Sequence, residues 1–124
     1  MSSSPESPAA AQLPSGLVAF VKRDCPTCEL VEDVLEEIAA ESKLTVYTQD
    51  DPKFPSRLHP EDDTDLTVSW HHQIEAVPTL LRVENGVEIE RVLGWHRGEW
   101  EELSGMNGLG EGLPDQRPGC GSLS

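Results

Sequence analysis

The sequence predicts an α/β fold in which a central mixed sheet of about four strands is flanked by helices, in the order β-α-β-α-β-β-α. Three observations predict this. A continuous apolar run over 16–21 is typical of a strand buried on both faces. Apolar residues then recur at spacings of three and four over 26–42, as in a helix, before a β-rich run over 44–48. Further on, Asn85-Gly86 separates two β-rich runs, which indicates a hairpin.

The order of these elements also predicts how they connect. A helix between the first two strands favours a parallel pair with a right-handed crossover. Residues 50–65 are rich in Pro and Asp and are expected to form a loop. A short helix is expected next, capped by Asp63 or Thr64 and carrying Leu66, Trp70 and Ile74. Strands are expected over 77–83 and 87–93. A last helix is expected over 96–104, with Trp100 and Leu103 facing inward and Gly105 as its C-terminal cap.

A chain of 124 residues suffices for one domain. We expect the folded part to span 15–105. Residues 1–14, mostly Ser, Pro and Ala, predict a disordered N-terminal tail, and 106–124 predict a flexible Gly-rich C-terminal tail. The first residues have neither the positive region nor the apolar region of a signal peptide, so the expected location is cytoplasmic.

The charge balance is strongly acidic. Nine Lys and Arg stand against 23 Asp and Glu, which gives a formal net charge of -14. Such a surface argues against nucleic acid as a partner and against binding to anionic membranes. The acidic residues are expected to form a solvated surface, with selection of a basic partner as the alternative.

The motif that carries chemistry is Cys25-Pro26-Thr27-Cys28, which follows the first strand and opens the first helix. Free backbone N–H groups at a helix start favour a thiolate at Cys25. Cys28 lies one turn further on the apolar side, so it is expected to be more buried. We expect Cys25 to attack a substrate disulfide and Cys28 to resolve the mixed disulfide, with no cofactor and no metal.

Two other interpretations of the cysteine pair are open. A structural zinc site needs about four ligands, and none of the four histidines stands in a motif with the cysteines. Alternatively, the two cysteines are ordinary helix residues, which their position between a strand and a helix disfavours. The neighbours His71 and His72 could form half of a metal site, but a solvated helix end is the preferred interpretation.

Together with Ala76-Val77-Pro78-Thr79 and the hairpin leading to Gly94, the Cys-x-x-Cys motif resembles the thioredoxin family over about residues 16–104. The resemblance implies a thioredoxin-like fold and a protein-disulfide reductase, a thiol–disulfide oxidoreductase. Its substrates would be protein or small-molecule disulfides, and a separate reductase would donate electrons. The resemblance also implies a cis Val77–Pro78 bond beside the cysteines, where Val77, Pro78 and Thr79 meet an extended substrate. Trp95 would either contact the substrate or belong to the core.

Three positions depart from the thioredoxin pattern. Asp24 stands where the family usually carries a Trp before the first cysteine. Ala19 replaces a buried acid that helps to take the proton from the second cysteine, and Val21 replaces a nearby aromatic residue. These departures leave an alternative function open, a thioredoxin-fold protein-binding or redox-sensing module with little turnover.

Cys120 lies in the Gly-rich C-terminal tail with no partner nearby in the sequence. Three interpretations stay open. It could be a third redox cysteine on a flexible arm, it could mark a further domain linked at the C-terminal tail, or it could be incidental.

Overall fold

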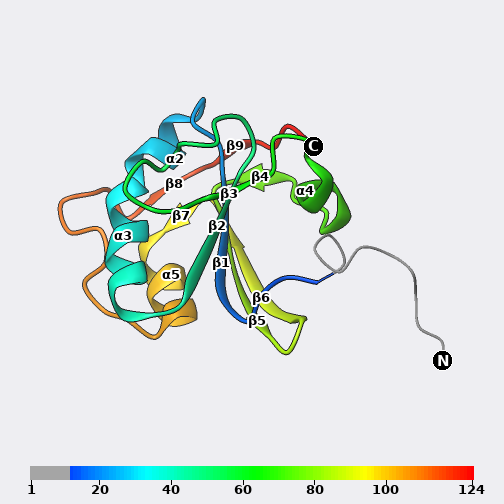
Figure 1. Cartoon of the computed structure of the whole chain (residues 1–124). Helices are drawn as coiled ribbons and strands as arrows, with labels where there is room; N and C mark the ends of the chain where they lie inside the picture. The colour runs from blue at the N-terminus through cyan, green and yellow to red at the C-terminus, as the bar shows by residue number, and fades with distance from the viewer. Residues whose placement is uncertain (1–11) are drawn as a thin grey trace.

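The computed structural model describes residues 12–124, and its centre is a mixed five-stranded sheet (Figure 1). The β1 strand (Gly16–Val21) pairs in parallel with β2 (Leu44–Thr48) and antiparallel with β5 (Thr79–Glu84). The β5 strand in turn pairs antiparallel with β6 (Val87–Leu93). The expected mixed α/β architecture is therefore confirmed, and the structure adds a two-residue edge strand, β3. In spatial order the strands are β3 (Glu61–Asp62), β2 (Leu44–Thr48), β1 (Gly16–Val21), β5 (Thr79–Glu84) and β6 (Val87–Leu93).

Helices lie on both sides of the sheet. Figure 1 shows α3 (Glu32–Glu41) and α5 (Arg97–Ser104) on one side and the short α4 (Thr67–His71) on the other. The single helix expected over 26–42 is instead two helices. The first, α2 (Pro26–Leu30), ends at Leu30, because the ψ of 5° at Val31 departs from the helical value. The hydrogen bonds continue through this break, because the Val31 N–H still donates to Thr27 O at 3.1 Å.

The α4 helix begins later than expected. Leu66 has a left-handed φ of 64°, so the regular helix starts at Thr67 rather than at residue 64. Asp63 still caps it, because its carboxylate accepts the N–H groups of Val68 and Ser69, both at 2.9 Å. The expectation that the helix carries an apolar side holds only in part, since Ile74 is 2% exposed whereas Trp70 is 75% exposed.

The core lies between β1 and the helices. Every β1 residue after Gly16 is buried, which confirms a strand covered on both faces. Val34, Leu35 and Ile38 of α3 pack against this sheet. Trp100 of α5 is fully buried and meets Trp95 edge to face, with ring centroids 5.1 Å apart. No helix within residues 12–124 is long and apolar enough to cross a membrane.

Two turns have the backbone conformation that their sequences predict. Asn85 and Gly86 adopt φ values of 53° and 79° between β5 and β6, as a tight hairpin requires. Gly105 ends α5 with a φ of 74°.

The segment 106–124 lies against the domain, which corrects the expectation that the folded part ends at residue 105. Leu109 is 1% exposed, because it belongs to the core. Two short strands follow. The first, β8 (Gln116–Arg117), pairs with β7 (Trp95–His96), and the second, β9 (Cys120–Gly121), pairs with β4 (Ala76–Val77). In Figure 1 this orange-to-red segment crosses the top of the sheet. Its flexibility stays a prediction.

Only the last three residues of the expected N-terminal tail, 1–14, fall within the structure, and residues 1–11 lie outside the described residues. Leu13 belongs to the core and is 5% exposed, so the folded part begins slightly earlier than expected.

Candidate redox site

Cys25 and Cys28 lie where β1 gives way to α2. Cys25 is the N-cap of the helix and has an extended backbone, while Pro26 occupies the first helical turn, where an N–H would be unpaired. The Cys28 N–H donates a hydrogen bond to Cys25 Sγ at 3.3 Å. Both thiols are free, and both are buried, Cys25 being 1% exposed and Cys28 0%. The loop therefore brings the two sulfur-bearing side chains together in a site shielded from water.

Cys28 is held as a neutral thiol. Burial is the largest cause that raises its pKa far above the usual value, and the nearby Cys25 raises it further. The Lys22 N–H, 3.5 Å from Cys28 Sγ, opposes this shift. Ala19, fully buried, offers no carboxylate at the position where the thioredoxin family has one. Deprotonation of Cys28 therefore needs another acceptor.

The cysteine loop faces the end of β4. The Cys25 thiol donates to Val77 O at 3.6 Å, and the Val77–Pro78 peptide bond is cis. Pro78 separates β4 from β5. Thr79 is buried and turns its hydroxyl back to Ala76 O at 2.6 Å. The structure thus brings Cys25, Cys28, Val77 and Pro78 together, with Thr79 fixing the loop behind them.

Trp95 is 1% exposed, in keeping with a place in the core. Its indole N–H donates to Pro114 O at 2.8 Å, and the Arg97 guanidinium lies over its ring at 5.9 Å. A contact between Trp95 and a substrate stays a prediction.

The C-terminal segment supplies residues that the sequence analysis did not place at the site. Cys120 stands opposite Val77 in the β4–β9 pair, next to Cys25. The Thr27 hydroxyl donates to Pro118 O at 2.7 Å, and Lys22 Nζ donates to Gly121 O at 2.8 Å. The sequence contains a sign of this close approach, since Cys120 stands between two glycines, Gly119 and Gly121, whose backbone has no side chain in the way. A sequence pattern cannot show where such a segment lies.

The zinc interpretation and the His71-His72 neighbours both concern possible metal ligands. Across residues 12–124, no group of three or more His, Cys, Asp and Glu is arranged to hold a metal ion. His71 and His72 lie edge to face with ring centroids 5.0 Å apart.

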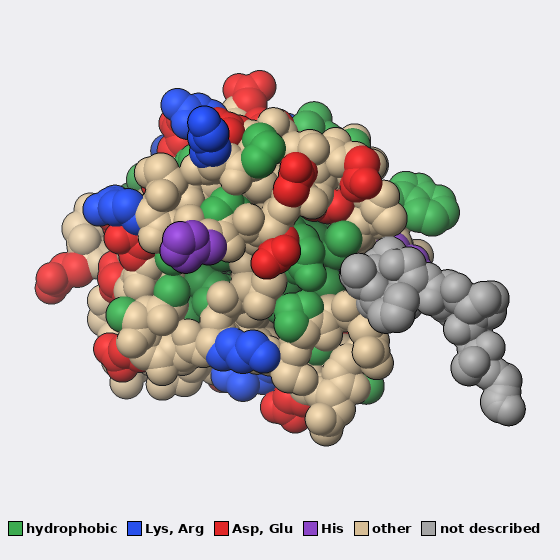
Figure 2. Space-filling model, viewed as in Figure 1, with side chains coloured by type: hydrophobic (Ala, Val, Ile, Leu, Met, Phe, Trp, Pro, Cys, Tyr) green, Lys and Arg blue, Asp and Glu red, His purple; other side chains and the backbone are tan. Residues whose placement is uncertain are grey.

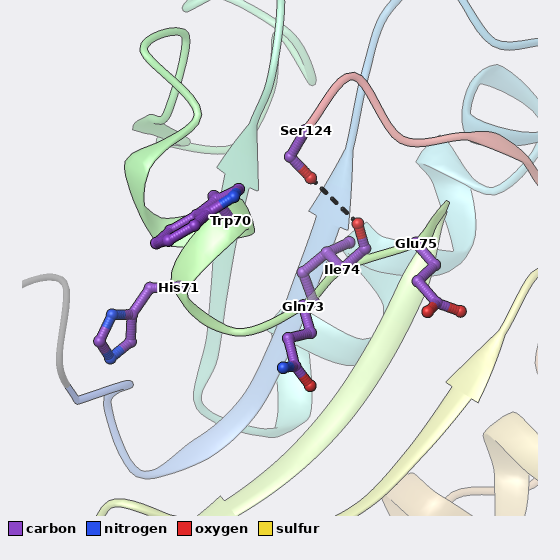
Figure 3. A pocket seen from close by; sticks show the side chains of 6 residues that line it. All are labelled: Trp70, His71, Gln73, Ile74, Glu75 and Ser124. Atoms are coloured by element: carbon purple, nitrogen blue, oxygen red, sulfur yellow. Dashed lines mark hydrogen bonds between the residues drawn. The ribbon is translucent and has the colours of Figure 1, made fainter.

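A hollow of about 660 Å³ lies at the end of the C-terminal segment rather than at the cysteines (Figure 3). Ser124 forms one wall and donates its hydroxyl to Ile74 O at 3.0 Å. The other residues that line the hollow are Trp70, His71, Gln73 and Glu75.

The surface shown in Figure 2 carries Lys and Arg in separate groups among acidic and neutral side chains.

The chain was compared with family models and with known proteins. No family model matches the chain. The chain is 30% identical over 80 residues to a thioredoxin of Mycolicibacterium smegmatis. This chain is similar to a thioredoxin. The match covers 63% of this chain and 63% of that relative. The chain therefore spans less than two thirds of this relative's length, and the mixed α/β sheet is consistent with a thioredoxin-like fold.

Proposed function

We propose that this protein is a thioredoxin-like protein-disulfide reductase that works through a Cys25–Cys28 dithiol/disulfide cycle. The observation that carries the proposal is the 3.3 Å hydrogen bond from the Cys28 N–H to Cys25 Sγ, beside the Val77–Pro78 bond. This arrangement holds two thiols one helical turn apart and next to backbone groups that an extended disulfide substrate could meet.

The cycle follows from the unequal roles of the two thiols. Cys25 as thiolate attacks one sulfur of the substrate disulfide, which forms a mixed disulfide and releases one substrate thiolate. Cys28 then loses its proton and attacks Cys25 Sγ, which releases the second substrate thiolate and leaves the Cys25–Cys28 disulfide. A separate reductase returns two electrons. Since Ala19 cannot accept the Cys28 proton, we assign that role to water that enters when the site is uncovered for the substrate.

The substrate is a protein or small-molecule disulfide. A peptide in extended conformation would pair its backbone with Val77, next to Pro78, which has no N–H to compete. The net charge of -14 favours substrates and reductases with basic surfaces. We place the activity in the cytoplasm, where reductases keep thiols reduced.

Reduction of insulin tests the proposal. We expect Cys25→Ser to abolish turnover, and the double variant Cys28→Ser/Cys120→Ser, in which Cys25 is the one remaining thiol, to stop after one attack and retain the substrate as a mixed disulfide. If both variants reduce insulin as fast as the wild type, or if oxidised Cys120→Ser protein contains no Cys25–Cys28 disulfide, the proposal is wrong.

A second function, a binding or redox-sensing module, is favoured by one observation: Cys25 is only 1% exposed. A buried nucleophile is expected to turn over slowly unless something uncovers it. A pull-down separates the two functions, since the module requires the Cys25→Ala/Cys28→Ala double variant to retain its partner, whereas the reductase requires the partner to be lost.

A further inference from the structure

The C-terminal segment occupies the edge of β4 as an added strand. Cys120 stands opposite Val77, and Gly121 stands opposite Ala76, in an antiparallel pair. The pairing continues beyond β9, where the Ser122 N–H donates to Glu75 O at 3.1 Å. This is the backbone edge that an extended disulfide peptide would use, so the chain supplies its own occupant.

The position of this strand depends on glycine. A Cβ on Gly119 would lie 2.5 Å from Val77 O, a distance that real Cβ atoms essentially never show. On the facing side, a Cβ on Gly94 would lie 3.0 Å from Gly119 N. By contrast, a Cβ on Gly121 would meet nothing within 4 Å. The backbone at Gly119 therefore approaches the backbones of Val77 and Gly94 this closely only because Gly94 and Gly119 have no side chains.

Buried and half-buried polar groups hold the strand at both ends. Before Cys120, the Thr27 hydroxyl donates to Pro118 O. After it, the buried Gln49 uses both halves of its amide, since Nε2 donates to Ser122 Oγ at 2.7 Å and Oε1 accepts the Leu123 N–H at 2.9 Å. These contacts fix the strand on either side of Cys120.

Cys120 and Cys25 are neighbours as a result. Burial and a hydrogen bond with the Cys25 side chain raise the pKa of Cys120, while Lys22 opposes the shift. Cys120 remains partly exposed, whereas Cys25 and Cys28 are buried. Among the three thiols, Cys120 is the one that an external thiol reaches first.

We propose that Cys120 is a third redox residue, carried by a tethered strand that binds like a substrate and exchanges disulfides with Cys25. The proposal rests on the Cys25–Cys28 cycle. In the oxidised protein, the Cys120 thiolate attacks Cys25 Sγ, the Cys25–Cys28 bond breaks, and the Cys25–Cys120 bond forms. Cys28 leaves as a thiolate and takes up the proton that Cys120 lost. No electrons enter or leave, so the step needs no further oxidant.

The exchange moves the disulfide from a buried sulfur to a partly exposed one. The reductase can then attack Cys120 Sγ, which releases Cys25 as a thiolate. A resolving thiol of the reductase next attacks the mixed disulfide on Cys120, so that two electrons in total return to the protein. The tethered strand thereby gives an external thiol access to a pair that is otherwise shielded from it.

The Cys28→Ser variant tests this directly, because Cys25 and Cys120 are its only thiols. The reduced variant is equilibrated with reduced and oxidised glutathione, quenched in acid and digested with trypsin without reduction. We expect a disulfide between the peptides 24–43 and 98–124 within one chain. Gly119→Ala in this background should lower its equilibrium constant about tenfold, because a crowded Cβ displaces the strand. The matched change Gly121→Ala should leave it unaltered.

Two results would overturn the proposal. The first is that no Cys25–Cys120 disulfide forms within a chain, and that glutathione is instead attached to Cys25 and Cys120 separately or disulfides form only between chains. The other is an equal response to Gly119→Ala and Gly121→Ala, with circular dichroism showing both variants folded. The proposed function is judged separately, from the Cys25–Cys28 disulfide of Cys120→Ser protein treated with oxidised glutathione. If that disulfide forms while the Cys25–Cys120 linkage does not, only the role of Cys120 is wrong.

Discussion

The Thr27 hydroxyl donates a hydrogen bond to Pro118 O over 2.7 Å, and so joins the Cys-x-x-Cys loop to the C-terminal strand. Thr27→Val keeps the shape of the side chain and removes this bond. Since one such bond contributes about 1 kcal/mol net, we expect the strand to detach about five times more often. Iodoacetamide should then alkylate Cys25 about fivefold faster, as measured by mass mapping of the peptide 24–43.

Two controls accompany this variant. The same change at the exposed Thr67, in α4, should leave the rate at Cys25 unaltered. In the Gly119→Ala background, Thr27→Val should speed alkylation of Cys25 by less than fivefold, because the bond to Pro118 that it removes is already weakened when the neighbouring Gly119 is displaced. A full fivefold effect in that background would contradict this coupling.

Burial of Cys28 predicts a loss of stability in alkaline solution. Its pKa in the folded protein is raised, so above the unfolded-state value of about 9 the unfolded chain releases a proton that the folded chain keeps. The free energy of unfolding is therefore unaffected by this group below that pH and falls above it, by about 1.4 kcal/mol per pH unit. Urea denaturation of the reduced protein from pH 8 to 10 measures the slope.

Other groups with raised pKa values, such as Tyr47, add to the same trend. The difference between wild type and Cys28→Ser isolates the contribution of Cys28, because serine does not titrate in this range. Oxidation to the Cys25–Cys28 disulfide should flatten the slope in the same way. Parallel curves for wild type and Cys28→Ser would show that the Cys28 thiol ionises freely.

The parts of the fold that the sequence predicts are those encoded locally. Asn85 and Gly86 adopt the positive φ values that their dipeptide favours, and Cys25 and Cys28 lie one turn apart because their spacing requires it. The β1 strand is buried on both faces, as its unbroken apolar run predicts. These features depend on neighbours in sequence, so a pattern of a few residues contains them.

The position of the C-terminal segment 106–124 is not encoded locally, because it depends on partners far along the chain. Cys120 pairs with Val77 and Arg117 pairs with Trp95. A Gly-rich and Pro-rich segment with few apolar residues is typical of a linker, and the same composition also allows close backbone contact. Only the three-dimensional structure separates these two uses, so the sequence alone does not place Cys120 at the site.

Asp63 is a buried carboxylate that holds the start of α4. It is 0% exposed and accepts the Val68 N–H, the Ser69 N–H and the Ser69 hydroxyl, the last at 2.6 Å. Asp63→Ala leaves these donors without an acceptor, so we expect it to destabilise the protein by about 3 kcal/mol in urea denaturation. The exposed neighbour Asp62 serves as the control, and Asp62→Ala should have little effect. Equal losses from the two variants would show that the buried hydrogen bonds do not matter.

Arg97 determines where the segment after α5 lies. Its Nε donates to Leu109 O at 2.9 Å, its Nη2 donates to Gly110 O and Leu113 O, both at 2.7 Å, and its Nη1 pairs with Asp115. Arg97→Met removes these bonds and keeps much of the side-chain volume. We expect a loss of about 2 kcal/mol in stability, because three backbone carbonyls lose a charged donor.

A protease readout places this loss in the segment itself. Endoproteinase Glu-C should cleave Arg97→Met faster after Glu111 than it cleaves the wild type, while sites in α3 stay protected. Arg57→Met is the matched control, because Arg57 is 63% exposed and pairs with the exposed Asp33 and the partly exposed Glu36, so the stability of this variant should differ from that of the wild type by less than about 1 kcal/mol. Equal cleavage after Glu111 in both variants would mean that the segment stays in position without Arg97, held by the burial of Leu109 and by other contacts such as the hydrogen bond from the Trp95 indole to Pro114 O.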